Sequence, residues 1–335
     1  MTLPRRLLLL AGAAALARPA LIRPARAQPA AWPDRTITLV VPFLAGGSTD
    51  IAARVLAERL APRLGPAARI VVENRGGAGG AVGSEWVRHR PADGHTLLLG
   101  TASSHATNPA ALPAQTPYDP VEDFTSIAMV GGGPLVLVVP AASRWQTAQE
   151  LIAAVKAAPG RYSWATSGAG GVGHLTGEYM KMAAGGMSAE HVPYRGGSAV
   201  MEALAKGEVE YSLEVLASTA AHIRDGLSRG LAVTSRERHP LFPDMPTLDE
   251  SGLKGFEVTT WNILFGPKGM PPALTVRINA AVRETLADPA VAQRLAAAGV
   301  DPAPPRSPEE TREFLAAELA KFRDIVARAG LRLGR

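Results

Sequence analysis

The sequence predicts an α/β protein built from two similar halves and a helical C-terminal segment. Short β-branched and apolar runs alternate with helical patterns from Thr36 to Leu99, and the same alternation returns from Leu135 to Thr234. From Ser307 onward the pattern is helical only. Because strands that alternate with helices form parallel sheets with helical crossovers, we expect each half to be such a sheet.

The first half is predicted to alternate strands and helices from its start. Its helical spacing is clearest at Ile51, Val55, Leu56 and Leu60, which share one helix face. The expected segments are a strand at Thr36–Val41, a loop at Pro42–Thr49, a helix at Asp50–Leu60, a strand at Arg69–Val72, a helix through Trp86 and Val87, and a strand at Thr96–Leu99.

The second half repeats this order and is followed by the last helices. Thr147 and Glu150 have capping-box spacing, which predicts a helix to Ala157, and Ser307 with Glu310 predicts a final amphipathic helix that returns to the first half. The other expected segments are strands at Leu135–Val139, Tyr162–Ala165, His191–Tyr194, Glu210–Glu214 and Leu231–Thr234, helices from about His174 and Ser198, and a β-rich stretch at Phe256–Phe265.

Residues 1–27 have the pattern of an export signal. Arg5 and Arg6 precede an apolar run from Leu7 to Leu16, and Ala25–Ala27 is a small-x-small cleavage site. That run is too short to cross a membrane. We expect the mature chain to begin at Gln28 in the periplasm. The arginine pair leaves both the general secretory and the twin-arginine route open, and a buried N-terminal helix is the alternative.

The composition excludes several classes of protein. The 335 residues are 47% apolar and contain no cysteine, so disulfides, thiolate metal sites and cysteine nucleophiles are excluded. The net charge of +5 comes from five arginines in residues 1–27, which contain no acid. The rest of the chain is neutral, without the basic footprint of a nucleic-acid-binding protein.

No motif predicts catalysis, a metal or a cofactor. The seven histidines lack zinc-site spacing, and there is no Gly-x-Ser-x-Gly elbow or Walker loop. His105 and His174 are the candidates for a general base, because each follows a predicted strand. The run from Gly168 to Gly173 matches G-x-G-x-x-G, but the acid that follows, Glu190, precedes a strand instead of ending one, which argues against a dinucleotide site.

Two glycine-containing loops are the candidate binding site. Phe43–Asp50 and Ser167–Gly173 each join a strand to a helix, so each exposes unpaired N–H groups at the positive end of a helix. Ser48 and Thr49 add hydroxyls, whereas Asp50 would repel an anion and is expected to bond locally. Facing loops would hold a carboxylate through hydrogen bonds of about 1.5–3 kcal/mol each, enough for roughly micromolar affinity.

A series of short motifs runs in order along the expected mature chain. They are Val41-Pro42-Phe43 with Gly46-Gly47 and Asp50, Val72-Glu73-Asn74-Arg75, Gly77–Gly80, Asp93-Gly94, Tyr118-Asp119-Pro120, Asp123-Phe124, Ser167-Gly168 with His174-Leu175, Pro193–Gly196, Ala232–Ser235, Pro243–Thr247 and Trp261. In this order they resemble the Bug family, the extracytoplasmic solute receptors of tripartite tricarboxylate transporters.

This resemblance implies a two-lobed type II periplasmic-binding-protein fold with the ligand cleft between the lobes. Residues 28–128 and 248–335 would form lobe 1, and residues 129–247 lobe 2. The ligand would be a small carboxylate, and the partners would be the transporter's membrane subunits or a sensor kinase, with the receptor a monomer. The implied ligand-binding residues are Phe43, Gly46, Gly47, Ser48, Thr49, Thr101, Ser103, Asn108, Ser167, Gly168, Gly170, Gly171, Arg195 and Glu214.

Three departures from the family pattern bear on the ligand. Leu44-Ala45 stands where prolines are common, Gly171-Val172 where hydroxyl residues are common, and Glu214 where many members have aspartate. Glu214 would either bind a ligand amine or lock the loops. A secreted α/β enzyme acting on a carboxylated substrate is the alternative function, and a sensory binding protein is another.

Overall fold

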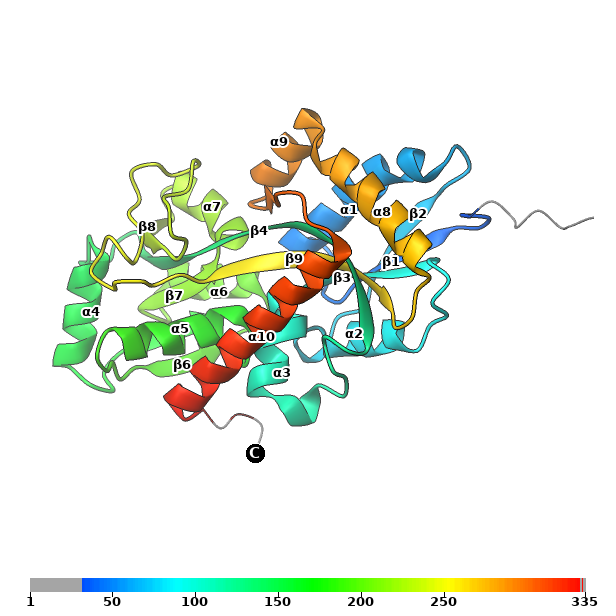
Figure 1. Ribbon diagram of the computed structural model, residues 1–335. Coiled ribbons are helices and arrows are strands. Elements are labelled where there is room, and N and C mark those ends of the chain that lie inside the picture. The colour runs from blue at the N-terminus through cyan, green and yellow to red at the C-terminus, as the bar shows by residue number, and fades with distance from the viewer. Residues whose placement is uncertain (1–31, 332, 334–335) are drawn as a thin grey trace, which may run out of the picture. The chain divides into compact units, whose positions relative to one another are not determined.

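The computed structural model describes residues 32–331 and 333, so the predicted export signal lies outside the described residues. Contacts group Pro33–Arg335 into one unit. A mixed sheet runs through this unit with helices on both faces (Figure 1). The strand order is β2-β1-β3-β9-β4-β7-β5-β6, and β8 and β10 also pair with β4.

The N-terminal half forms as predicted. β1 (Ile37–Val41) lies between β2 (Ile70–Asn74) and β3 (Thr96–Thr101), and both pairings are parallel. The helices are α1 (Ser48–Leu64) and α2 (Ala81–Arg88), the latter preceded by η1 (Ala78–Gly80). Because the strands are parallel, the loops after β1 and β3 emerge at the same edge of the sheet.

The second half repeats the arrangement. β5 (Ser163–Thr166) pairs in parallel with β6 (Glu190–Pro193) and β7 (Tyr211–Val215). The crossover and covering helices are α4 (Ala148–Ala157), α5 (Val172–Ala183), α6 (Gly197–Lys206) and α7 (Leu216–Arg224). The predicted Thr147 cap is present, but the Glu150 carboxylate accepts from the N–H of Gln146, not from that of Thr147. The α7 helix was not predicted.

Two long antiparallel strands join the halves, and they correct the expectation of purely parallel sheets. β4 (Phe124–Pro140) pairs with β9 (Thr259–Pro267) as far as Pro134, and then with β7 and β8 (Ser228–Val233) from Leu135 onward. Only Leu135–Val139 of β4 was predicted. The missed part contains Gly131 and Gly132, where the backbones of neighbouring strands approach too closely for a side chain.

The C-terminal helices return to the first half, as predicted. α8 (Pro272–Leu286) and α9 (Pro289–Ala297) pack on α1, and β10 (Asp301–Pro302) pairs with β4. The final helix α10 (Pro308–Ala329) starts at the predicted capping box and lies in front of β9 (Figure 1). It also contacts α5, so it touches both halves. Among the described helices, none combines the length and apolarity needed to cross a membrane.

Candidate functional site

The loop after β1 is held by a buried carboxylate at the start of α1. Asp50 accepts hydrogen bonds from Gly46 N (2.9 Å), Asn74 Nδ2 (3.0 Å) and Arg54 Nε (3.0 Å). Burial acts to raise the pKa of Asp50, but the hydrogen bonds from Arg54, Gly46 and Asn74 outweigh it and hold that pKa below its usual value. Asp50 is therefore an ionised local clamp, as the sequence predicted. Asn74 also donates to Phe43 O (3.1 Å).

This clamp leaves the beginning of α1 open. The N-cap is Gly47, which provides no side-chain cap, so the first turn keeps unpaired N–H groups. Gly46 and Gly47 are exposed, and Ser48 and Thr49 are half-buried. The Ser48 hydroxyl makes no hydrogen bond within the described part of the chain, while Thr49 Oγ1 accepts a long one from Asn262 Nδ2 (3.4 Å).

The segment after β3 turns through a π-helical stretch, η2 (Ser103–Thr107), into α3 (Asn108–Ala111), and η3 (Pro113–Gln115) follows. Thr101 is buried and bonds locally: its N–H donates to Ser104 Oγ (3.0 Å), and its hydroxyl accepts from Ser104 N (3.3 Å). Asn108 is buried and donates from Nδ2 to Gly79 O (2.8 Å). The structure thus gives Thr101 and Asn108 supporting contacts.

The loop after β5 is locked by Glu214, which lies at the end of β7. Ser167 donates to its carboxylate from the backbone N–H (3.0 Å) and from the hydroxyl (3.2 Å), and Val215 N donates at 3.0 Å. Glu214 is 2% exposed, and this burial raises its pKa against the effect of the three hydrogen bonds. Of the two roles that the sequence left open for Glu214, the structure shows the locking one.

Segments of the two halves meet at the start of α5. Val172 N, at the first position of that helix, donates across to Ser103 Oγ (3.2 Å). Gly170, at φ +77°, lies against the segment after β3: a Cβ there would come within 2.5 Å of Leu112 Cδ1 and 3.0 Å of Asn108 Oδ1. Only glycine fits both this backbone conformation and this space.

The structure brings some of the predicted site residues together and leaves others apart. Ser103, Asn108, Gly170 and Gly171 meet at the contact between the halves. Within the described residues, no hydrogen bond joins the Phe43–Thr49 loop directly to the Ser167–Gly171 loop. Arg195 is exposed in the turn before α6, and it forms no ion pair with a described acid.

The two candidate bases are both buried. His105 is stacked on Phe265 (centroids 4.2 Å apart), its Nδ1 lies 2.9 Å from Ser104 Oγ, and burial lowers its pKa to about 3. His174 accepts a hydrogen bond from Gly170 N at its Nδ1 (3.0 Å). Both imidazoles therefore contribute to local structure. Among residues 32–331 and 333, no group of three His, Asp or Glu side chains is arranged to hold a metal ion.

Sequence reasoning missed two residues that shape these loops. Asn74 was quoted only as part of a motif, yet it ties the first loop to the end of β2. Its position at the carboxyl end of a strand beside β1 is the signal that identifies it. The N–H of Val172 was missed because the pairing with Ser103 joins segments that are far apart in the sequence.

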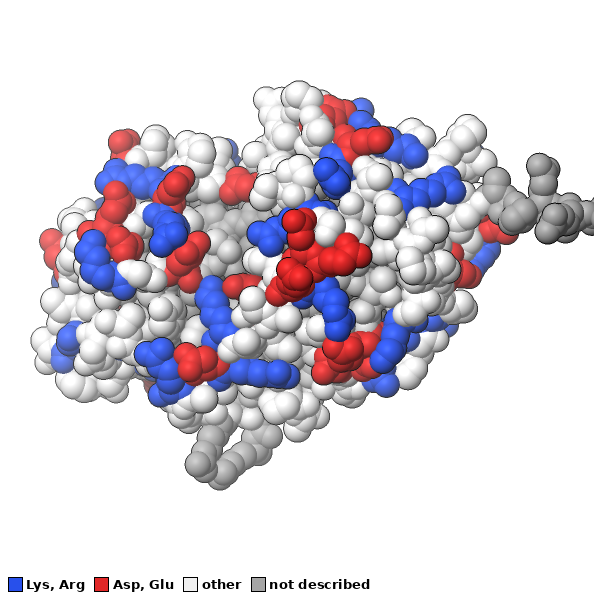
Figure 2. All heavy atoms as spheres, in the orientation of Figure 1, with Lys and Arg blue, Asp and Glu red and all other residues white. Residues whose placement is uncertain are grey.

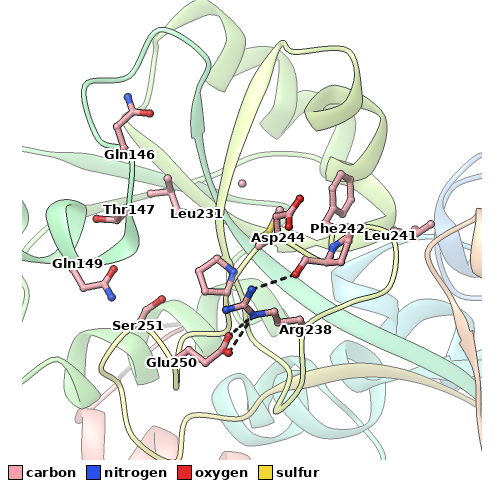
Figure 3. A pocket seen from close by; sticks show the side chains of 14 residues that line it. Gln146, Thr147, Gln149, Leu231, Arg238, Leu241, Phe242, Asp244, Glu250 and Ser251 are labelled. Carbon is pink, nitrogen blue, oxygen red and sulfur yellow. Dashed lines mark hydrogen bonds and ion pairs between the residues drawn. The ribbon is translucent and has the colours of Figure 1, made fainter.

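A hollow of about 640 Å³ lies elsewhere, between the start of α4 and residues 238–251 (Figure 3). In Figure 3 the Arg238 side chain points to Glu250, with which it forms an ion pair (2.9 Å). None of the sequence-predicted site residues lines this hollow. Acidic and basic side chains are interspersed over the face shown in Figure 2.

Known proteins resemble the chain over nearly its whole length. A family model described as "Tripartite tricarboxylate transporter family receptor" matches residues 52–331. Protein BugT of Bordetella pertussis is 36% identical over 302 residues, which is 90% of this chain and 91% of that protein.

Solved structures agree with this relationship. An R. palustris protein with adipate has a TM-score of 0.83 at 32% identity, covering 90% of this chain and 99% of that one. MatC from Rhodopseudomonas palustris with bound malate has a TM-score of 0.80 at 31% identity, and the match covers 88% of this chain and 100% of MatC. The periplasmic binding protein BugD has a TM-score of 0.80 at 32% identity, and the match covers 90% of this chain and 99% of BugD. The fold is therefore the two-lobed fold of periplasmic binding proteins, and the chain belongs to the family of tripartite tricarboxylate transporter receptors, as its motifs implied.

Proposed function

We propose that this protein is a periplasmic receptor that binds a small carboxylate between its lobes and delivers it, chemically unchanged, to the membrane subunits of a tripartite tricarboxylate transporter. The relatives solved with adipate and with malate support a dicarboxylate as the ligand class. The same family relationship and the predicted export signal support the proposed periplasmic location.

The observation that carries the proposal is the pair of helix starts at Gly47 and Gly171. Both helices begin at a glycine that provides no side-chain cap, so their positive dipole ends face the loops. In α1 the first-turn N–H groups are open to a carboxylate, whereas in α5 a carboxylate would have to replace Ser103 Oγ as the acceptor for Val172 N. The proposed ligand-binding residues are those inferred from the sequence, with Thr101 and Glu214 acting through the loops that they support.

The proposed lobes are residues 28–128 with 248–335, and residues 129–247. The change of β4's partners at Pro134 and Leu135 supports a crossing between lobes within this strand. We further propose a monomer that binds its ligand by closure of the two lobes. The buried positions of His105 and His174 argue against the enzymatic alternative.

A thermal-shift panel of carboxylates tests this function. A ligand that binds only the folded state stabilises it by mass action and so raises the melting temperature. At a free ligand concentration of one hundred times the dissociation constant, the free energy of unfolding increases by about 2.7 kcal/mol. We expect a shift with at least one dicarboxylate and recovery of that compound with unchanged mass. Conversion of the compound would instead support the enzymatic alternative, and a pull-down of a membrane kinase in place of transporter subunits would support the sensory one.

A further inference from the structure

Two stacked imidazoles lie behind the loop that joins β5 to α5. His174, in the first turn of α5, and His191, on β6, have parallel rings (11°) with centroids 3.8 Å apart. His174 Nδ1 accepts from Gly170 N (3.0 Å). His191 Nε2 lies 2.7 Å from Thr166 Oγ1, which donates to Gly168 O (3.1 Å). The pair thus holds the glycine turn on both sides.

The hydrogen bonds define the protonation of both rings. When Thr166 donates its hydroxyl proton to Gly168 O, its oxygen is left to accept from His191, and the proton of the neutral His191 ring is then on Nε2. His174 accepts at Nδ1, so its proton is on Nε2 as well. A proton added to His174 can go only to Nδ1, where it would oppose the N–H of Gly170.

The surroundings favour the neutral pair. Burial, followed by the charges of His174 and Lys181, lowers the pKa of His191 to about 3. Burial also lowers the pKa of His174, and this outweighs the opposite effect of the Glu178 carboxylate. The charged groups facing His174 are Glu178, 3.9 Å from Nε2, and Lys181, which pairs with Glu178 at 2.9 Å. On β5, the ring of Trp164 contacts both imidazoles and is itself stacked on Tyr211 of β7.

We propose that His174, stacked on His191, is a positioning residue of the ligand site that orients the Gly170–Gly171 turn toward the ligand and releases it when protonated. The proposal rests on the proposed carboxylate-binding function. Gly170 packs against Leu112 and Asn108 of the first half, and its N–H is buried, so an apolar residue at position 174 would leave a buried N–H group without an acceptor. The turn would then shift, and the adjoining start of α5 would lose its alignment.

Two substitutions of similar size separate positioning from packing. In His174→Asn the Oδ1 atom can replace Nδ1 as the acceptor for Gly170 N, whereas His174→Leu fills the space without an acceptor. With a carboxylate identified by the panel, we expect titration calorimetry near pH 7.5 to show at least tenfold weaker binding for His174→Leu and binding within about threefold of the native protein for His174→Asn. The control is His89→Leu, at an exposed histidine that directly follows α2.

The pH dependence gives a second readout. On acidification, the native protein should lose affinity for the carboxylate more steeply than His174→Asn, which has no imidazole at position 174 to protonate. The titration of the ligand itself affects both proteins equally. Long-range proton–nitrogen NMR on the native protein should show neutral His174 with its proton on Nε2. The proposal would be overturned if folded His174→Leu bound the carboxylate as tightly as the native protein. It would also be overturned if the affinity of the native protein and that of His174→Asn depended on pH in the same way. A native protein that binds no carboxylate would instead overturn the proposed function.

Discussion

Asp50 and Glu214 are buried carboxylates that hold the two loops proposed to bind the ligand, but their electrostatic surroundings differ. Asp50 is paired with Arg54 and has a lowered pKa, so it stays charged well into acid. Glu214 has no cation among its hydrogen-bond partners, and burial raises its pKa. On acidification, Glu214 is therefore protonated before Asp50. The protonated carboxyl group is a weaker acceptor for the hydrogen bonds from Ser167.

Glu214→Gln is predicted to weaken carboxylate binding about tenfold, a loss of about 1.4 kcal/mol. The amide NH₂ of Gln would replace a carboxylate oxygen that accepts a hydrogen bond from Ser167, so two hydrogen-bond donors would face each other. A matched control exists in Glu210, which accepts from Ser163 N (2.8 Å) and Ser163 Oγ (3.0 Å) at the start of β5. Calorimetry should show native affinity for Glu210→Gln. Equal losses in both variants would mean that Glu214 acts only on general stability.

His105→Phe is predicted to flatten the acid dependence of stability. With a folded pKa of about 3 against a usual 6.5, neutral His105 contributes stability that is complete above pH 6.5 and is lost as the pH falls toward 3. Between pH 3 and 6.5, the free energy of unfolding should therefore change less steeply with pH in His105→Phe, by up to about 1.4 kcal/mol per pH unit. Urea unfolding at several pH values measures this slope. Phe preserves the stack on Phe265. An unchanged slope would show that His105 is not the group that titrates.

At the scale of elements, the parallel strands were predictable because each is a short β-branched or apolar run followed by a helical pattern. The first part of β4 was not, because Gly131–Gly133 and Pro134 have the composition of a loop. What makes them strand residues is their contact with β9 and β10, which lie far away in the sequence.

Gly132→Ala is predicted to destabilise the protein by at least about 1–3 kcal/mol, since its Cβ would lie 2.2 Å from Thr260 O in the neighbouring strand. The adjacent Gly133 is the graded comparison, because the nearest atom to its Cβ would be Gly299 O at 3.0 Å. Denaturant unfolding should therefore show a smaller loss for Gly133→Ala. The reverse order would contradict the account of why β4 needs glycine here.

The two loops proposed to bind the ligand were predictable as strand-to-helix connections but not in detail. Glycines and hydroxyl residues between a strand and a helix were sufficient to indicate that Phe43–Thr49 and Ser167–Gly171 are such loops. Which N–H groups remain open could not be deduced, since Ser103 reaches Val172 from the other half and His174 takes the N–H of Gly170. Such pairings depend on how distant segments pack, which no local pattern encodes.

At the scale of the whole molecule, the halves are connected by more than the two long strands. Ser103 bonds to the start of α5, and α10 contacts elements of both halves. A carboxylate bound at the start of α5 would compete with the Ser103 hydroxyl for the N–H of Val172. We therefore expect ligand binding to rearrange this contact between the halves.

The most direct test of the central claim is a calorimetric titration of the mature protein with the carboxylate found by the panel, repeated on the double variant Ser48→Ala with Ser167→Ala. The control is Ser188→Ala, at an exposed serine distant in sequence from both loops. We predict one site per chain, roughly micromolar or tighter affinity in the native protein and the control, and at least tenfold weaker binding in the double variant. Unchanged affinity in a folded double variant would contradict the assignment of the carboxylate to these two loops.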